Sequence, residues 1–119
     1  MSNPYQTALK WILQNTGTGG RNSLCKLILS LWNPDDYPFS VASCLGNLDE
    51  NLTRLALEMI EDYARHGETP ELVEVGRKVF EASPGLVELG IAARDAMYGV
   101  RSRWDREREA ERERLYGDN

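Results

Sequence analysis

Hydrophobic residues recur every three or four positions along most of this chain, which is the spacing of one face of an α-helix. The first such stripe consists of Tyr5, Ala8, Leu9 and Ile12. Asn3 precedes it in a capping position, and Pro4 occupies the first helical position, where a missing N–H costs nothing. The glycine-rich segment at 16–20 ends this predicted helix.

Two further stripes predict the centre of the core. A helix that begins near Arg21 is the most apolar and is expected to be the most buried; its inward residues are Leu24, Cys25, Leu27, Ile28, Leu29, Leu31 and Trp32. A second helix is capped by Asp49 and ends at Gly67. Its stripe is Leu52, Leu55, Ala56, Met59, Ile60 and Tyr63.

The segment SLWNPDDYPFS, at 30–40, lies between these two helices. Asn33-Pro34 ends the first helix, because the residue before proline avoids helical backbone angles. We expect Pro38 to prevent an early restart, Phe39 to pack inward and Ser40 to cap a short helical turn. We therefore interpret this segment as a structural link, and a binding loop is the alternative.

Two helices that begin at proline complete the pattern. Thr69 caps the first at Pro70, and its inward residues are Leu72, Val75, Val79 and Phe80. Ser83-Pro84 repeats this start signal for a last helix, whose stripe is Leu86, Leu89, Ala93, Met97, Val100 and Trp104. From Asp105 onwards Arg and Glu alternate and the stripe ends.

The predicted fold is all-α: a compact bundle of about five helices with a long charged C-terminal helix. We expect a helical domain at 1–104 and a charged helical or frayed extension at 105–119. The 119 residues suit one domain.

The net charge of −5 is unevenly spread. Residues 1–34 carry three basic and no acidic residues, residues 35–95 carry thirteen acidic and five basic, and residues 101–119 carry six arginines and six acidic residues. An acidic body repels nucleic acid and suits a basic protein partner. The neutral balance of the C-terminal segment also disfavours nucleic-acid binding through its arginines.

No catalytic, metal or cofactor site is predicted. One histidine and two distant cysteines do not supply the paired ligands of a zinc site. Cys25 and Cys44 lie in apolar surroundings and are expected to be buried free thiols of a reducing cytoplasm. No apolar run approaches the ~20 residues that span a bilayer, and the N-terminus lacks a signal-peptide pattern, so we expect a cytoplasmic protein without membrane contact.

Two surface features remain as candidate binding sites. The start of the helix that begins near Arg21 resembles an anion-binding loop, with Gly19, Gly20, Arg21 and Asn22 as its residues, although a linker between helices is the preferred interpretation. The second candidate is an acidic surface for a protein partner, formed by Glu58, Glu61, Asp62, Glu71 and Glu74.

Residues 18–60 resemble a family of small uncharacterised bacterial proteins carried on plasmids, integrative elements and prophages. The matching positions are Thr18, Gly19, Leu24, Leu27, Leu29, Trp32, Asn33, Phe39, Leu48 and Asp49. The resemblance implies an origin in a mobile element and brings no established activity with it.

Together these features predict a non-enzymatic protein–protein interaction module of a phage or mobile element. Its expected partner is a host protein or nucleic-acid-processing complex, with inhibition of a host defence complex (anti-CRISPR-like) as the specific hypothesis. The alternatives are a self-associating helical scaffold, such as a homodimer, and a nucleic-acid binder that uses the arginine-rich tail.

Overall fold

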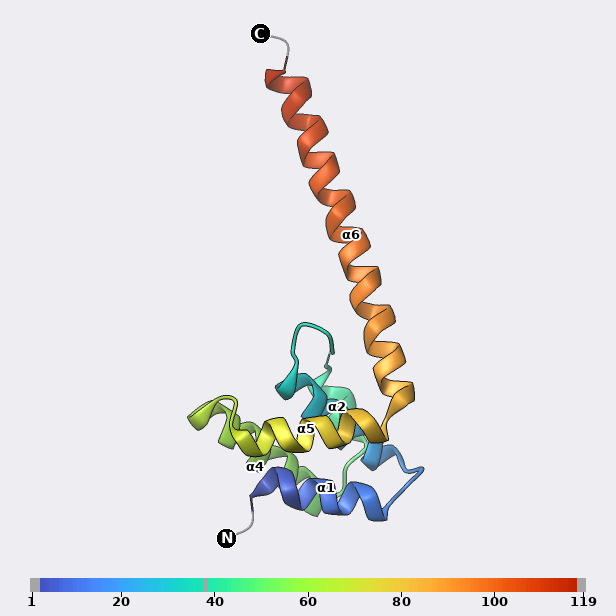
Figure 1. The fold of residues 1–119 in the computed structure, drawn as a ribbon, viewed down its shortest axis with the longest axis vertical. Coiled ribbons are helices and arrows are strands. Elements are labelled where there is room, and N and C mark those ends of the chain that lie inside the picture. The colour runs from blue at the N-terminus through green and yellow to red at the C-terminus, as the bar shows by residue number, and fades with distance from the viewer. Residues whose placement is uncertain (1–2, 38, 118–119) are drawn as a thin grey trace.

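The computed structural model describes residues 3–37 and 39–117, and within them the chain forms six helices and no strand (Figure 1). The helices are α1 (Pro4–Gln14), α2 (Gly19–Trp32), α3 (Val41–Gly46), α4 (Glu50–His66), α5 (Pro70–Ala82) and α6 (Pro84–Tyr116). The predicted all-α class is confirmed. The sixth helix is the short α3, which the sequence indicated only as a helical turn.

Side-chain caps set most of the helix starts. In five helices the residue before the first turn accepts a backbone N–H from that turn; these residues are Asn3, Thr18, Ser40, Asp49 and Thr69. Because Thr18 caps α2, this helix begins at Gly19, two residues before the predicted start near Arg21. The expected cap at Ser83 is wrong: its hydroxyl donates instead to Sγ of Cys25, at 3.6 Å.

The core is built around α2, which packs against α1, α3, α4 and α5. The expectation that α2 is the most buried helix is confirmed, since Leu24, Cys25, Leu27, Ile28 and Leu29 are almost inaccessible to solvent. The predicted stripes of α1, α4 and α5 also face inward. Their fully buried members include Tyr5, Ala8, Ile12, Ala56, Met59, Leu72, Val75 and Val79.

At the C-terminal end of α2, two aromatic residues lie at the edge of the core. Trp32 is half-buried and meets Phe80 edge to face, with ring centroids 5.8 Å apart. The prediction that Phe80 faces inward is wrong: it is 39% exposed, because it lies in the last turn of α5, at the edge of the core, where its ring contacts that of Trp32. The Trp32 ring also rests on Gly76 of α5, where a Cβ would stand 2.5 Å from its Cγ.

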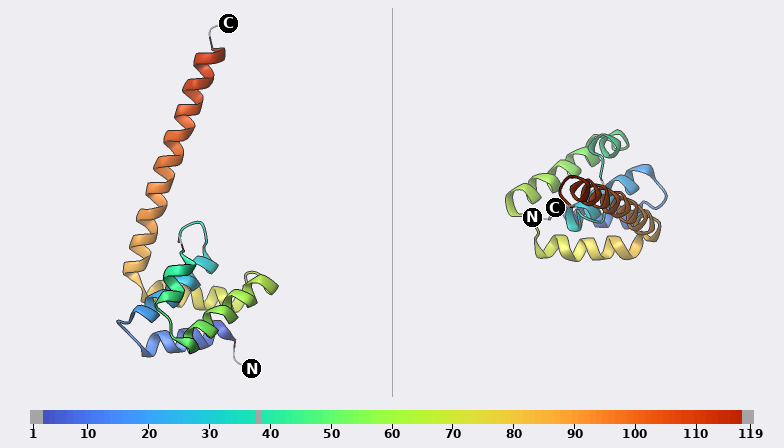
Figure 2. Two further views of the ribbon diagram at one scale, coloured as in Figure 1. Left: turned by 180° about the vertical axis from the view of Figure 1, so that it is seen from behind. Right: turned by 90° about the horizontal axis from the view of Figure 1, so that it is seen from above.

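The last helix leaves the body instead of folding back onto it, as Figures 1 and 2 show. The molecule is therefore elongated, measuring 67 × 30 × 25 Å along its principal axes. α6 continues through position 104 without a break. From Asp95 to Gly117 its residues are exposed, except that Val100 and Ser102 are half-buried.

None of the helices in the described part of the chain combines the length and the apolar character needed to cross a membrane. The role expected for Pro38 lies outside the described residues.

Candidate functional site

The base of α6 rests on the link between α2 and α3. Tyr37 of this link is buried and lies against Gly90 of α6. A Cβ at position 90 would stand 2.6 Å from two carbons of the Tyr37 ring and 3.1 Å from the carbonyl oxygen of Asp36. The helix and the link can approach this closely only because position 90 carries no side chain. Asp36 and Tyr37 of the link thus position α6.

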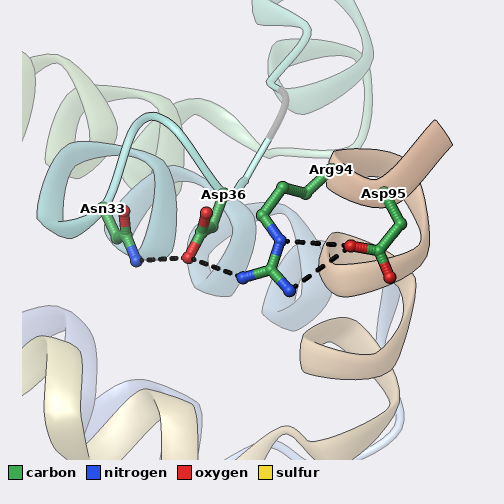
Figure 3. Close-up of polar contacts among 4 residues, drawn as sticks. All are labelled: Asn33, Asp36, Arg94 and Asp95. Carbon is green, nitrogen blue, oxygen red and sulfur yellow. Dashed lines mark hydrogen bonds and ion pairs between the residues drawn. The ribbon is translucent and has the colours of Figure 1, made fainter. Parts of the chain in front are cut away.

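A polar network beside this contact also joins the link to α6 (Figure 3). Asn33 donates from Nδ2 to Oδ2 of Asp36 at 3.0 Å, and Arg94 donates from Nη1 to the same oxygen at 3.4 Å. The guanidinium of Arg94 also pairs with Asp95, one position along α6, at 3.4 Å. Such exposed ion pairs contribute at most about 1 kcal/mol each, so this network orients α6 more than it anchors it.

A groove with a volume of about 450 Å³ opens at the same place, between α2, the link, α3 and the base of α6. Its apolar lining includes Leu29, Phe39, Leu86 and Leu89. Lys26 contributes a positive charge to its wall, and none of the described lining residues is acidic. This groove suits an apolar group that ends in, or is flanked by, negative charge.

Cys44 in the groove wall is not prepared for nucleophilic chemistry. Its thiol donates to the carbonyl oxygen of Ser23 at 3.6 Å. Burial raises its pKa, and the nearby Lys26 opposes that rise only in part. A nucleophilic cysteine needs the opposite shift, toward the thiolate. Cys25 is buried as well, and burial likewise raises its pKa. Both thiols are free, so the prediction of two buried free thiols is confirmed.

The apolar stripe of α6 begins in this groove and continues along the free part of the helix. We call it the α6 stripe: Leu86, Leu89, Ala93, Met97, Val100 and Trp104. Leu86, Leu89 and Ala93 line the groove. The exposed fractions are 65% for Leu89, 37% for Met97 and 51% for Trp104. The sequence predicts the 3–4 spacing of this face, and the structure leaves three of its six residues exposed and the other three half-buried.

The five acidic residues predicted to bind a partner differ in their surroundings. Glu58 is exposed, whereas Glu61 pairs with an arginine of its own helix at 2.7 Å. Asp62 is half-buried beside the phenol of Tyr5, whose pKa is raised by burial and further by this carboxylate. On α5, Glu71 is half-buried and Glu74 pairs with Lys78 at 3.3 Å.

These acids come from two helices that are not main packing partners of each other, since α4 packs chiefly on α1 and α2. The acidic surface therefore stays a prediction, with Glu58 as its most available member.

The predicted anion-binding loop is largely occupied by contacts within the protein. Thr18 accepts the backbone N–H of Arg21 at 3.1 Å. The Arg21 side chain donates to the carbonyl oxygen of Ala82 at 3.2 Å, at the C-terminal end of α5. Gly20 packs against Leu52 and Trp11. This arrangement matches the linker interpretation, and anion binding here stays a prediction.

Within residues 3–37 and 39–117, no three His, Cys, Asp or Glu side chains are grouped in a way that could hold a metal ion. Comparison with known proteins adds no family: no protein-family model, curated protein or solved structure matches this chain. The features of the molecule that bear on its function are therefore those of its own surface, above all the groove and the α6 stripe.

Proposed function

We propose that this protein acts without catalysis, by binding another protein through the α6 stripe and the groove at its base. The observation that supports this proposal is an apolar stripe with coiled-coil spacing on a helix that leaves the body. Such a stripe normally faces a partner, because helices in proteins are stabilised mainly by the packing of their apolar face.

The exposed area gives the scale of the contact. Covering Leu89, Met97 and Trp104 would remove roughly 300 Å² of apolar surface from water, or roughly 7 kcal/mol before any cost of association. The free-energy cost of bringing two molecules together is of similar size to this gain. The stripe alone is thus a weak site, and we propose that a partner also enters the groove, where Leu86 and Phe39 extend the apolar surface.

The narrower form of the proposal follows the resemblance over residues 18–60. In this form the protein is a cytoplasmic product of a phage or mobile element and inhibits a host nucleic-acid-processing complex, such as a defence complex. Small size, an acidic body and a protruding binding helix support it. The acidic residues of α4 and α5 would then provide a second contact, toward a basic part of the same target.

Site-specific photo-crosslinking in living cells tests the proposal. A photoreactive amino acid at position 97 should yield an adduct with one protein that mass spectrometry identifies. The matched control is position 106, which lies on the opposite side of α6, and it should yield no such adduct. The adduct should also disappear when Val100→Asp places a charge in the stripe. An equal set of adducts from positions 97 and 106 would contradict the proposal.

A further inference from the structure

The residues beside the α6 stripe indicate what kind of helix covers it. Ala93, Met97, Val100 and Trp104 follow steps of four, three and four, which places them at the core positions a and d of a heptad. The flanking e and g positions then face the sides of a paired helix. Between residues 94 and 108 they are Arg94, Ala96, Arg101, Arg103 and Arg108. Four of these five are arginines, and none is acidic.

A second copy of this chain does not match these flanks. In a parallel pair Arg103 would face Arg108 of the other copy, and in an antiparallel pair each flank would face its own equivalent, again arginine against arginine. Like charges so placed destabilise the pair. The stripe also ends early, because Glu107 and Glu111 occupy the next two core positions. The part of the α6 stripe that extends beyond the body is shorter than the three to four heptads typical of a coiled coil.

The arginines are available to a partner. Arg101 forms no ion pair within the described part of the chain. Arg103 pairs with Glu107 at 3.6 Å, and both side chains are more than half exposed. Arg94 is held by Asp36 and Asp95 at 3.4 Å, again near the surface. Exposed pairs of this kind are weak, so carboxylates on an incoming helix can replace them.

From the apolar stripe, its basic flanks and the groove containing Lys26, we infer that the occupant is an amphipathic helix of another protein whose flanks carry Glu or Asp. Its apolar face covers Met97, Val100 and Trp104, and its carboxylates face Arg94, Arg101 and Arg103. This inference rests on the proposed function and adds the chemistry of the partner.

Three synthetic helices of about three heptads test the inference directly. They share one apolar stripe and differ only at the flanks, which carry Glu, Gln or Lys. Binding to the full chain is measured by fluorescence anisotropy at low and high salt. The Glu peptide should bind at least tenfold more tightly than the Lys peptide at low salt, a difference of about 1.4 kcal/mol. The difference should shrink as salt screens the charges.

Two charge-reversal variants provide the matched comparison. Arg101→Glu with Arg103→Glu should reverse the preference, so that the Lys peptide binds more tightly than the Glu peptide. Arg106→Glu with Arg112→Glu changes the net charge equally, outside the a, d, e and g positions, and should preserve the original order. Unchanged circular dichroism shows that each variant still folds.

The possible failures differ in what they overturn. Equal binding of the Glu and Lys peptides would overturn the acidic partner and leave the proposed function standing. A dimer in sedimentation experiments that Met97→Asp abolishes would overturn the inference in favour of a second copy. Absence of binding by all three peptides would overturn both the inference and the proposed function.

Discussion

Replacing Gly90 by alanine tests how α6 is held at its base. In an exposed helix interior this change stabilises by about 1 kcal/mol, because alanine has the higher helix propensity. At position 90 the new Cβ would stand 2.6 Å from the Tyr37 ring, and overpacking of this kind costs about 1–3 kcal/mol. The net expectation is a loss of up to about 2 kcal/mol in the free energy of unfolding. Urea denaturation followed by circular dichroism measures it.

Two comparisons separate the clash from other effects. Gly85→Ala, in the first turn of α6, meets no atom within 4 Å and should be neutral or stabilising. When Tyr37 is first replaced by alanine, the ring is removed and only the Asp36 carbonyl oxygen, at 3.1 Å, stays close to the new Cβ, so Gly90→Ala should become much less destabilising. A double-mutant cycle thus should give a coupling energy above about 1 kcal/mol. If Gly90→Ala stabilises the wild-type protein as much as Gly85→Ala does, Tyr37 does not lie against α6.

Four further outcomes can be checked on the isolated protein. Gly76→Ala should destabilise by up to about 2 kcal/mol in urea denaturation, since the overlap of its Cβ with the Trp32 ring outweighs the higher helix propensity of alanine; a gain in stability would contradict this packing. Deleting residues 106–119 should leave the thermal midpoint unchanged in calorimetry, and a marked drop would show that this segment packs on the body. Burial raises the pKa of the Tyr5 phenol in the folded protein. The protonated phenol therefore contributes fully to the free energy of unfolding below about pH 10. This contribution is lost as the pH rises further, because the unfolded chain releases the phenol proton first. Tyr5→Phe should accordingly flatten the fall of stability from pH 10 to 11, whereas an unaltered slope would contradict the burial. Cys44 should react with iodoacetamide far more slowly than a free thiol at pH 8, because it is 4% exposed and burial raises its pKa; reaction at the rate of the unfolded chain would contradict this.

The body of the molecule could be predicted from the sequence because its signals are local. Asn3, Asp49 and Thr69 cap their helices as expected, and apolar stripes at 3–4 spacing identify the faces that are buried. Trp32 was expected to be a core residue and is only half-buried. A stripe identifies the face that packs, but how deeply a residue at its end is covered depends on the neighbouring helix.

The candidate site was harder to predict for the same reason. The α6 stripe was visible in the sequence, but its pattern does not tell whether the body or a partner covers it. The contact between Gly90 and Tyr37 joins residues 53 positions apart in the chain, and no local signal connects them. The arginines at the flanks could have been assigned to e and g positions from the sequence alone. These arginines indicate a binding surface only because α6 extends away from the body.

α2 and α5 pack tightly on each other, whereas the outer part of α6 has few neighbours. Amide hydrogen exchange detects this difference in packing residue by residue. Exchange of the full chain at low concentration is the measurement that tests most directly whether the α6 stripe is open to a partner. Amides in the buried turns of α2 should exchange only through global unfolding, whereas those of residues 97–104 should exchange much faster, because that part of α6 has little tertiary packing. Protection at 97–104 equal to that of α2, in a protein shown to be monomeric, would mean that the stripe packs on its own body, and the account of α6 as a binding surface would be wrong.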